Sequence, residues 1–303
     1  MATSTYFAQN ATQLQAALDV ARAHITAHPE HHWMLLIDSA FDHPVPPALY
    51  SGVNGYANTA ADDLAEVAPW LIPVYSPGGT LPETKELIEK WLRHCSGRPM
   101  LGLIACEGDA RALADYWADL HFMETSDPLD KPLLLRVADT RVTPTLGQWL
   151  TPAQWATWTR YLSHWLTIDR QGALQALVLA DKETSAARPP AIAPLLISNQ
   201  QINTLTDAAE PDALIGYMAE HLADMVPPEK ELPPAKFYDY VHATLQLARE
   251  HGVTQFPDKM ALVTATVLSG GKSLTDPRTR ALLLLRQWSP GQLDTALLDA
   301  KII

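Results

Sequence analysis

The chain has 303 residues, of which 47% are hydrophobic and 18% are charged, and its net charge is −12 at pH 7. This composition is typical of a folded globular protein and argues against an intrinsically disordered one, and the length allows two domains. Proteins that bind nucleic acid or anionic lipid present clustered Lys and Arg, so the acidic balance argues against both kinds of partner.

The N-terminal 25 residues have no basic leading segment and no continuous apolar block, so they do not have the pattern of a secretion signal. No apolar stretch reaches the length needed to span a bilayer. Cys95 and Cys106 are the only two cysteines, which favours reduced thiols over a disulfide framework. We therefore expect a cytoplasmic protein.

Residues 1–180 alternate between helical and strand-like patterns. Apolar residues recur at helical spacing near residues 11–27, 80–92 and 109–120. Short apolar runs that predict strands occupy residues 33–37, 67–75, 100–106 and 175–179. Pro69 and Pro73 favour a sheet-edge position for the second run, because proline donates no hydrogen bond to a neighbouring strand. The strand, helix, strand order predicts a small mixed or parallel sheet with flanking helices.

The segment from Lys131 to Trp149 combines an apolar run with charged residues. Residues 133–137 are almost continuously apolar, which predicts a strand covered on both faces. Arg136, Asp139 and Arg141 lie at its end. Buried charge is costly unless it is paired, so we interpret Asp139 and the two arginines as a local group of ion pairs that fixes the strand's end.

Tryptophans are frequent after residue 148. A helix is predicted to start at Thr151, and Trp155, Trp158, Leu162 and Trp165 would form one stripe along it. Large aromatic residues at helical spacing normally pack inward, yet aromatic residues are also enriched at the centre of protein interfaces. We therefore keep both interpretations of Trp155 and Trp158: core packing, or binding of another chain.

Residues 181–197 are rich in proline and charge, and they separate the α/β pattern from a purely helical one. Helical spacing of apolar residues continues from residue 198 to the C-terminus. We expect an α/β N-terminal lobe at residues 1–180, a Pro-rich linker at 181–197 and an all-α lobe at 198–303.

No recognisable catalytic motif is present. Neither cysteine lies in a catalytic signature, and no serine lies in a nucleophile-elbow pattern. His24, His28, His31 and His32 form the densest group of possible metal ligands, but Pro29 interrupts the helix and no zincin pattern is complete. We interpret them as solvated histidines at a helix end, and expect no metal and no cofactor. A metal-dependent hydrolase that uses this cluster is the alternative.

Three segments carry a recognisable order of motifs. An apolar strand ends in Asp38, Ser39 and Ala40; a second strand contains residues 68–72; and residues 135–142 include Arg136, Asp139 and Arg141. In this order and spacing the segments resemble the adaptor or chaperone proteins of bacterial type VI secretion, which share a conserved N-terminal domain of formerly unknown function. This sequence differs from the family pattern at Val137, Ala138 and Thr140, where the family has two aromatic residues and a proline.

The resemblance covers about the first three-fifths of the chain, and it implies a function without catalysis. Such a protein binds a toxic effector in the cytoplasm, often through the effector's N-terminal region, and helps to load it on the valine-glycine-repeat spike protein (VgrG). Asp38, Arg136, Asp139, Arg141, Trp155 and Trp158 are the residues we expect to contribute to binding. An immunity protein that neutralises a toxin is a further alternative.

Overall fold

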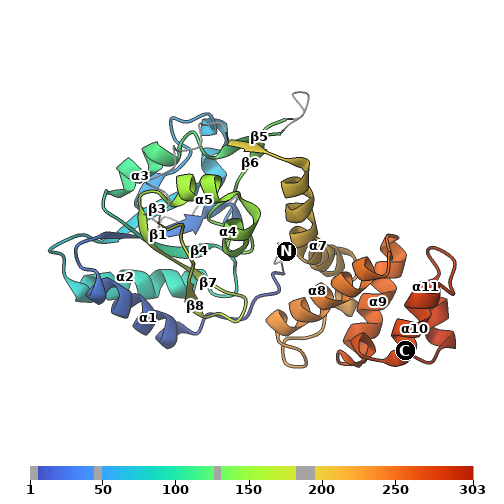
Figure 1. Cartoon of the computed structure of the whole chain (residues 1–303). Coiled ribbons are helices and arrows are strands. Elements are labelled where there is room, and N and C mark those ends of the chain that lie inside the picture. The colour runs from blue at the N-terminus through green and yellow to red at the C-terminus, as the bar shows by residue number, and fades with distance from the viewer. Residues whose placement is uncertain (1–5, 44–49, 126–130, 182–194, 303) are drawn as a thin grey trace. The chain divides into compact units, whose positions relative to one another are not determined.

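The computed structural model describes residues 6–43, 50–125, 131–181 and 195–302, and its contacts divide the chain into two compact units (Figure 1). The α/β unit comprises Gln9–Ala208, and the helical unit comprises Met1–Ala8 together with Ala209–Ile303. This division falls within a helix, at residue 208, whereas the sequence placed a linker at 181–197. Residues 182–194 of that linker lie outside the described part of the chain.

The α/β unit is built on a six-stranded sheet in which every neighbouring pair is antiparallel. Its strands, in spatial order, are β2 (Val53–Asn54), β3 (Pro69–Tyr75), β1 (His32–Asp38), β4 (Leu101–Cys106), β7 (Leu162–Ile168) and β8 (Leu174–Ala176). All six residues of β4 are buried, which explains its continuous apolar run.

Helices cover both faces of this sheet (Figure 1). α1 (Leu14–Ala27) and α2 (Leu81–His94) pack on one face, while α3 (Ala110–Trp117), α4 (Leu146–Trp149) and α5 (Pro152–Thr159) pack on the other. Successive side chains of a strand point to opposite faces, so Trp33, Leu35 and Ile37 contact the first helix pair. Met34 and Leu36 contact the second set. The mixed α/β architecture predicted from the sequence is confirmed.

A second, three-stranded sheet has the order β6 (Leu133–Leu134), β5 (Phe122–Thr125), β9 (Leu195–Ile197). β5 and β6 are antiparallel, whereas β5 and β9 are parallel. The prediction of a strand covered on both faces at residues 133–137 is wrong, because β6 has only two residues and Leu133 is 39% exposed. Leu135 and Val137 are buried in a turn instead, and an apolar run alone does not distinguish these cases.

Three further details differ from the sequence predictions. β4 and the strand that follows α3 belong to different sheets, so they do not form a parallel strand, helix, strand unit. β3 is not an edge strand, since β2 pairs with its outer side over two residues. Trp165 lies on β7 and not on the helix of Trp155, because α5 ends at Thr159.

The described part of the helical unit contains helices and no strand. After α7 (Asn199–His221), whose second half belongs to this unit, come α8 (Pro234–Glu250), α9 (Phe256–Leu268), α10 (Pro277–Leu285) and α11 (Leu293–Asp299). The all-α prediction for the helical unit is confirmed.

Short 3-10 helices occur in both units, at Ser39–Phe41, Asp62–Val67, Thr143–Thr145, Ala223–Met225 and Lys272–Leu274. None of the described helices is long and apolar enough to cross a bilayer.

Candidate functional site

Asp38 is the last residue of β1, and the structure places it beside Arg136, one of the two arginines predicted to pair with Asp139. Its Oδ2 accepts hydrogen bonds from Nε of Arg136 at 3.2 Å and from Nη2 of Arg136 at 2.8 Å. Its Oδ1 accepts the backbone N–H of Ala40 at 3.1 Å, which starts the 3-10 helix at Ser39. Two segments almost a hundred residues apart in sequence are therefore joined at the end of a central strand.

Asp139 is held mainly by Arg141. Its Oδ1 accepts the backbone N–H and the Nε–H of Arg141, each at 3.0 Å, and its Oδ2 accepts from Nη2 at 2.7 Å. Nη1 of Arg136 lies 3.8 Å from the same Oδ2, so this arginine interacts with both aspartates. We call Asp38, Arg136, Asp139, Arg141 and Phe41 the charge network.

Phe41 is the member that the sequence did not reveal. The guanidinium carbons of Arg136 and Arg141 lie 5.1 and 5.3 Å from the centre of its ring, within the range of a cation–π interaction. The sequence offered one signal, an aromatic residue three positions after Asp38. The predicted local ion pairs are thus confirmed for Asp139, and the structure extends them to β1 and the 3-10 helix after it.

The two carboxylates are buried, and the arginine side chains reach solvent. The aspartate side chains are each 3% exposed, whereas those of Arg136 and Arg141 are 36% and 26% exposed. Burial raises the pKa of Asp38 to about 6, with a further contribution from Asp139, while Arg136 opposes the rise. The network therefore presents positive charge at the surface while its negative charge lies beneath.

Trp155 and Trp158 pack in the core of the α/β unit, in line with the first of their two interpretations. Trp155 is 6% exposed, stacks on Trp165 and donates its indole N–H to the carbonyl of Val178 at 3.2 Å. Trp158 is fully buried against Trp117. In this conformation neither indole presents a face to another protein.

The histidines of residues 24–31 meet a fourth histidine, His164 of β7. The ring centres of His28 and His164 are 4.1 Å apart, and those of His24 and His164 are 5.7 Å apart. Burial and, to a smaller extent, the neighbouring imidazoles lower the pKa of His164 to about 4. His24 and His28 lie at the end of α1, as predicted, but this cluster is less open to solvent than the sequence implied.

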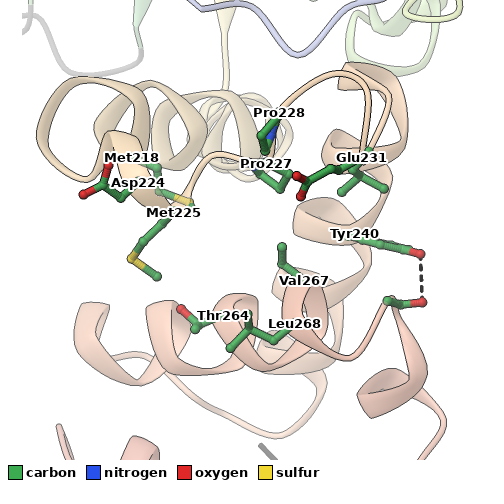
Figure 2. Close-up of a pocket in the computed structure, with 12 residues that line it drawn as sticks. Met218, Asp224, Met225, Pro227, Pro228, Glu231, Tyr240, Thr264, Val267 and Leu268 are labelled. Atoms are coloured by element: carbon green, nitrogen blue, oxygen red, sulfur yellow. Dashed lines mark hydrogen bonds between the residues drawn. The ribbon is translucent and has the colours of Figure 1, made fainter.

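The helical unit contains a pocket of about 570 Å³ that the sequence did not predict (Figure 2). Its apolar lining comes from Met218, Met225, Leu232, Val267 and Leu268, and Pro227 and Pro228 contribute to one wall. Two acidic residues, Asp224 and Glu231, also line it. Tyr240 is fixed there by a hydrogen bond from its hydroxyl to the carbonyl of Gly270 at 2.8 Å.

The pocket is partly open and mainly apolar. Leu268 is 72% exposed at the pocket. The volume lies within the range of about 300–1,000 Å³ that is typical of ligand-binding pockets. Methionine side chains are flexible and polarisable, so surfaces that contain them adapt to partners of different shape. The arrangement suits a short apolar segment better than a reactive group.

Residues 33–157 match one protein family, described as a domain of unknown function (DUF4123). No curated protein and no solved structure matches the chain. The match begins within β1, ends within α5 and includes all five residues of the charge network. This domain is associated with the effector adaptors of type VI secretion. The greater part of the α/β unit is therefore similar to a domain found in type VI secretion adaptors.

Proposed function

We propose that this protein is a type VI secretion adaptor that binds a cognate toxic effector in the cytoplasm and helps to load it onto the VgrG spike. The family match over residues 33–157 carries this proposal. The Asp38, Arg136, Asp139 and Arg141 motif lies within the match, and its residues meet at one site. The proposed role is binding, and it requires no covalent step.

The pocket of the helical unit supports the effector-binding part of the proposal. Its apolar lining would take an aliphatic or aromatic segment of the effector, and burial of apolar surface would drive the association. Asp224 and Glu231 are both exposed at the pocket, and the chain as a whole is acidic. Charge complementarity then favours an effector segment with Lys or Arg next to its apolar residues.

Co-expression tests the binding directly. The full chain, tagged, is produced together with the untagged product of each gene adjacent to its own, including any effector and any spike protein. The proposal predicts that one effector co-purifies through affinity and size-exclusion chromatography as a stable complex. Failure of every neighbouring effector and spike protein to form such a complex would contradict the proposal.

A matched pair of variants tests the pocket. Leu268 and Leu284 are both in helices of the same unit and are 72% and 73% exposed, but only Leu268 lines the pocket. An aspartate at position 268 places a charge in the apolar contact, so Leu268→Asp should weaken effector binding at least about tenfold. Leu284→Asp should bind like the wild type. Equal affinities of the two variants, measured by titration calorimetry, would exclude the pocket as the effector site.

A further inference from the structure

The loop between α1 and β1 brings together three side chains whose donor atoms suit a transition metal. Nδ1 of His28 lies 3.6 Å from Oε1 of Glu30, and Nε2 of His31 lies 3.3 Å from the same oxygen. All three donor atoms lie within 4.8 Å of one another. They come from four consecutive positions, so the loop backbone alone holds them close.

These separations agree with the geometry of a zinc site. Zinc binds imidazole nitrogen and carboxylate oxygen at about 2.0–2.2 Å with tetrahedral geometry, which places neighbouring ligand atoms about 3.4 Å apart. The two separations that involve Glu30 are close to this value. The spacing of Glu30 Oε1 from both imidazoles therefore suits ligands of one zinc ion.

The loop is also held in place by its own hydrogen bonds. The backbone N–H of His28 donates to the carbonyl of His24 at 3.1 Å, which ends α1, and the N–H of His31 donates to the carbonyl of His28 at 3.4 Å. Trp33 donates its indole N–H to the same His28 carbonyl at 3.1 Å. These contacts fix the positions of His28 and His31 relative to the first strand.

His164 provides a second, independent observation. It reaches the same place from β7, and its ring centre lies 4.1 Å from that of His28 and 6.1 Å from that of His31. Among the described residues, Nδ1 of His164 is buried and has no hydrogen-bond partner. Buried polar atoms normally have partners, so this nitrogen indicates a missing ligand.

We propose that His28, Glu30 and His31 form a binding site for a divalent transition ion of the zinc class, with His164 beside the open fourth position. Two imidazoles and one carboxylate favour such an ion, whereas magnesium and calcium prefer sites made of oxygen atoms. The bound ion would connect the end of α1 to the start of β1. This inference is independent of the proposed adaptor function.

Titration calorimetry with zinc chloride tests the site. The full chain is used after removal of any purification tag and treatment with a chelator. We expect one zinc ion per chain, a dissociation constant in the micromolar range or lower, a higher melting temperature with zinc, and no effect of magnesium chloride. Absence of stoichiometric zinc binding would overturn the proposal.

Variants separate this site from other histidines. Loss of a residue that hydrogen-bonds to a metal ligand weakens metal binding by about 10–100-fold. Glu30 would itself be a ligand, so Glu30→Gln should weaken zinc binding at least about tenfold. The Glu30 side chain is 60% exposed, so this change leaves the fold intact. The double variant His28→Ala, His31→Ala should abolish binding. His43→Ala is the control, since His43 is 46% exposed and has Glu66 at 4.0 Å. Retention of binding by Glu30→Gln or by the double variant would overturn the assignment.

Discussion

Asp38 and Asp139 are buried carboxylates whose arginine partners remain partly in solvent. This arrangement lowers the cost of burying charge, because each guanidinium keeps part of its hydration while it donates to an aspartate. Phe41 lies against both guanidinium groups, within the range of a cation–π interaction. The network is therefore a structural connection between β1 and the segment after β6.

Replacement of Asp139 should destabilise the α/β unit. In Asp139→Ala the Arg141 side chain and backbone lose three hydrogen bonds to the carboxylate. Removal of one member of a fully buried ion pair costs about 3–5 kcal/mol, and the partial exposure of both arginines reduces this to about 2–3 kcal/mol. Urea denaturation at pH 7 measures the change. A loss below about 0.5 kcal/mol would show that the network does not hold the fold together.

Asp38 should make the stability of the α/β unit depend on pH. Its pKa rises from the ordinary value of 3.8 to about 6, so the folded state binds this proton more tightly than the unfolded state. Stability from this group is fully present below pH 4 and is lost as the pH rises through 6, by up to about 3 kcal/mol. Asp38→Asn removes this proton uptake.

The wild type and Asp38→Asn are compared by urea denaturation at several values between pH 4 and pH 7. The free energy of unfolding of the wild type, minus that of Asp38→Asn, should fall as the pH rises across this interval. A difference that grows with pH would contradict this prediction, because it would mean that Arg136 lowers the Asp38 pKa more than burial raises it.

At the scale of elements, the central strands were the most predictable part of the fold. β1 and β4 are short apolar runs bounded by polar residues and turns, and both occur where the sequence places them. α5 starts at Thr151 as predicted, with a capping box formed by Thr151 and Gln154. Local signals were sufficient in these cases, because each element is specified by its own residues.

Predictions failed where distant contacts decide the structure. Residues 133–137 have the local pattern of a buried strand. The chain nevertheless turns there, and Arg136 contacts Asp38. Trp165 fits the helical spacing of Trp155 and Trp158, but it pairs with Ile104 of β4 as part of the sheet. Phe41 and the pocket lining could not be predicted, since their partners are far away in sequence.

Asp258 connects two elements of the helical unit. It lies in the first turn of α9, is 2% exposed, and accepts hydrogen bonds from the indole of Trp288 at 3.3 Å and from the backbone N–H groups of Gly291 and Leu293, each at 2.9 Å. Leu293 is the first residue of α11. One carboxylate thus fixes the loop before the last described helix.

Asp258→Asn should lower the free energy of unfolding by about 2 kcal/mol, because hydrogen bonds to a charged acceptor contribute about 1.5–3 kcal/mol and an amide has one acceptor oxygen. Asp276→Asn is the control. Asp276 accepts the backbone N–H of Arg278 at the start of α10, a position where Asn and Asp are equally favourable, and its ion pair with the exposed Arg278 side chain contributes little to stability. Thermal unfolding of both variants measures the difference, and equal melting temperatures would contradict the role assigned to Asp258.

At the scale of the whole molecule, the two-part architecture was predictable and the division between the parts was not. The sequence correctly indicated an α/β part followed by a helical part. It placed the division in the proline-rich stretch at 181–197, but α7 continues through Pro211 and the division falls within it. Composition marks where a pattern changes, while contacts decide which residues fold together.

The functional hypothesis came from motif order and not from composition. Charge, length and the absence of catalytic motifs fit many proteins, whereas residues 33–157, which include Asp38, Arg136, Asp139 and Arg141, match a domain associated with type VI secretion adaptors. The helical unit, which contains the pocket, lies outside that match. We propose that this unit is the part fitted to one particular effector.

Secretion of the effector tests the adaptor function in the cell. The gene for this protein is deleted in the bacterium that encodes it. The effector that co-purifies in the co-expression experiment is then measured in the culture medium and in the cells. The adaptor function predicts that the deletion prevents secretion of this effector, that the intact gene restores secretion, and that Leu268→Asp restores it less well than Leu284→Asp. Undiminished secretion of the effector from the deletion strain would contradict the adaptor function.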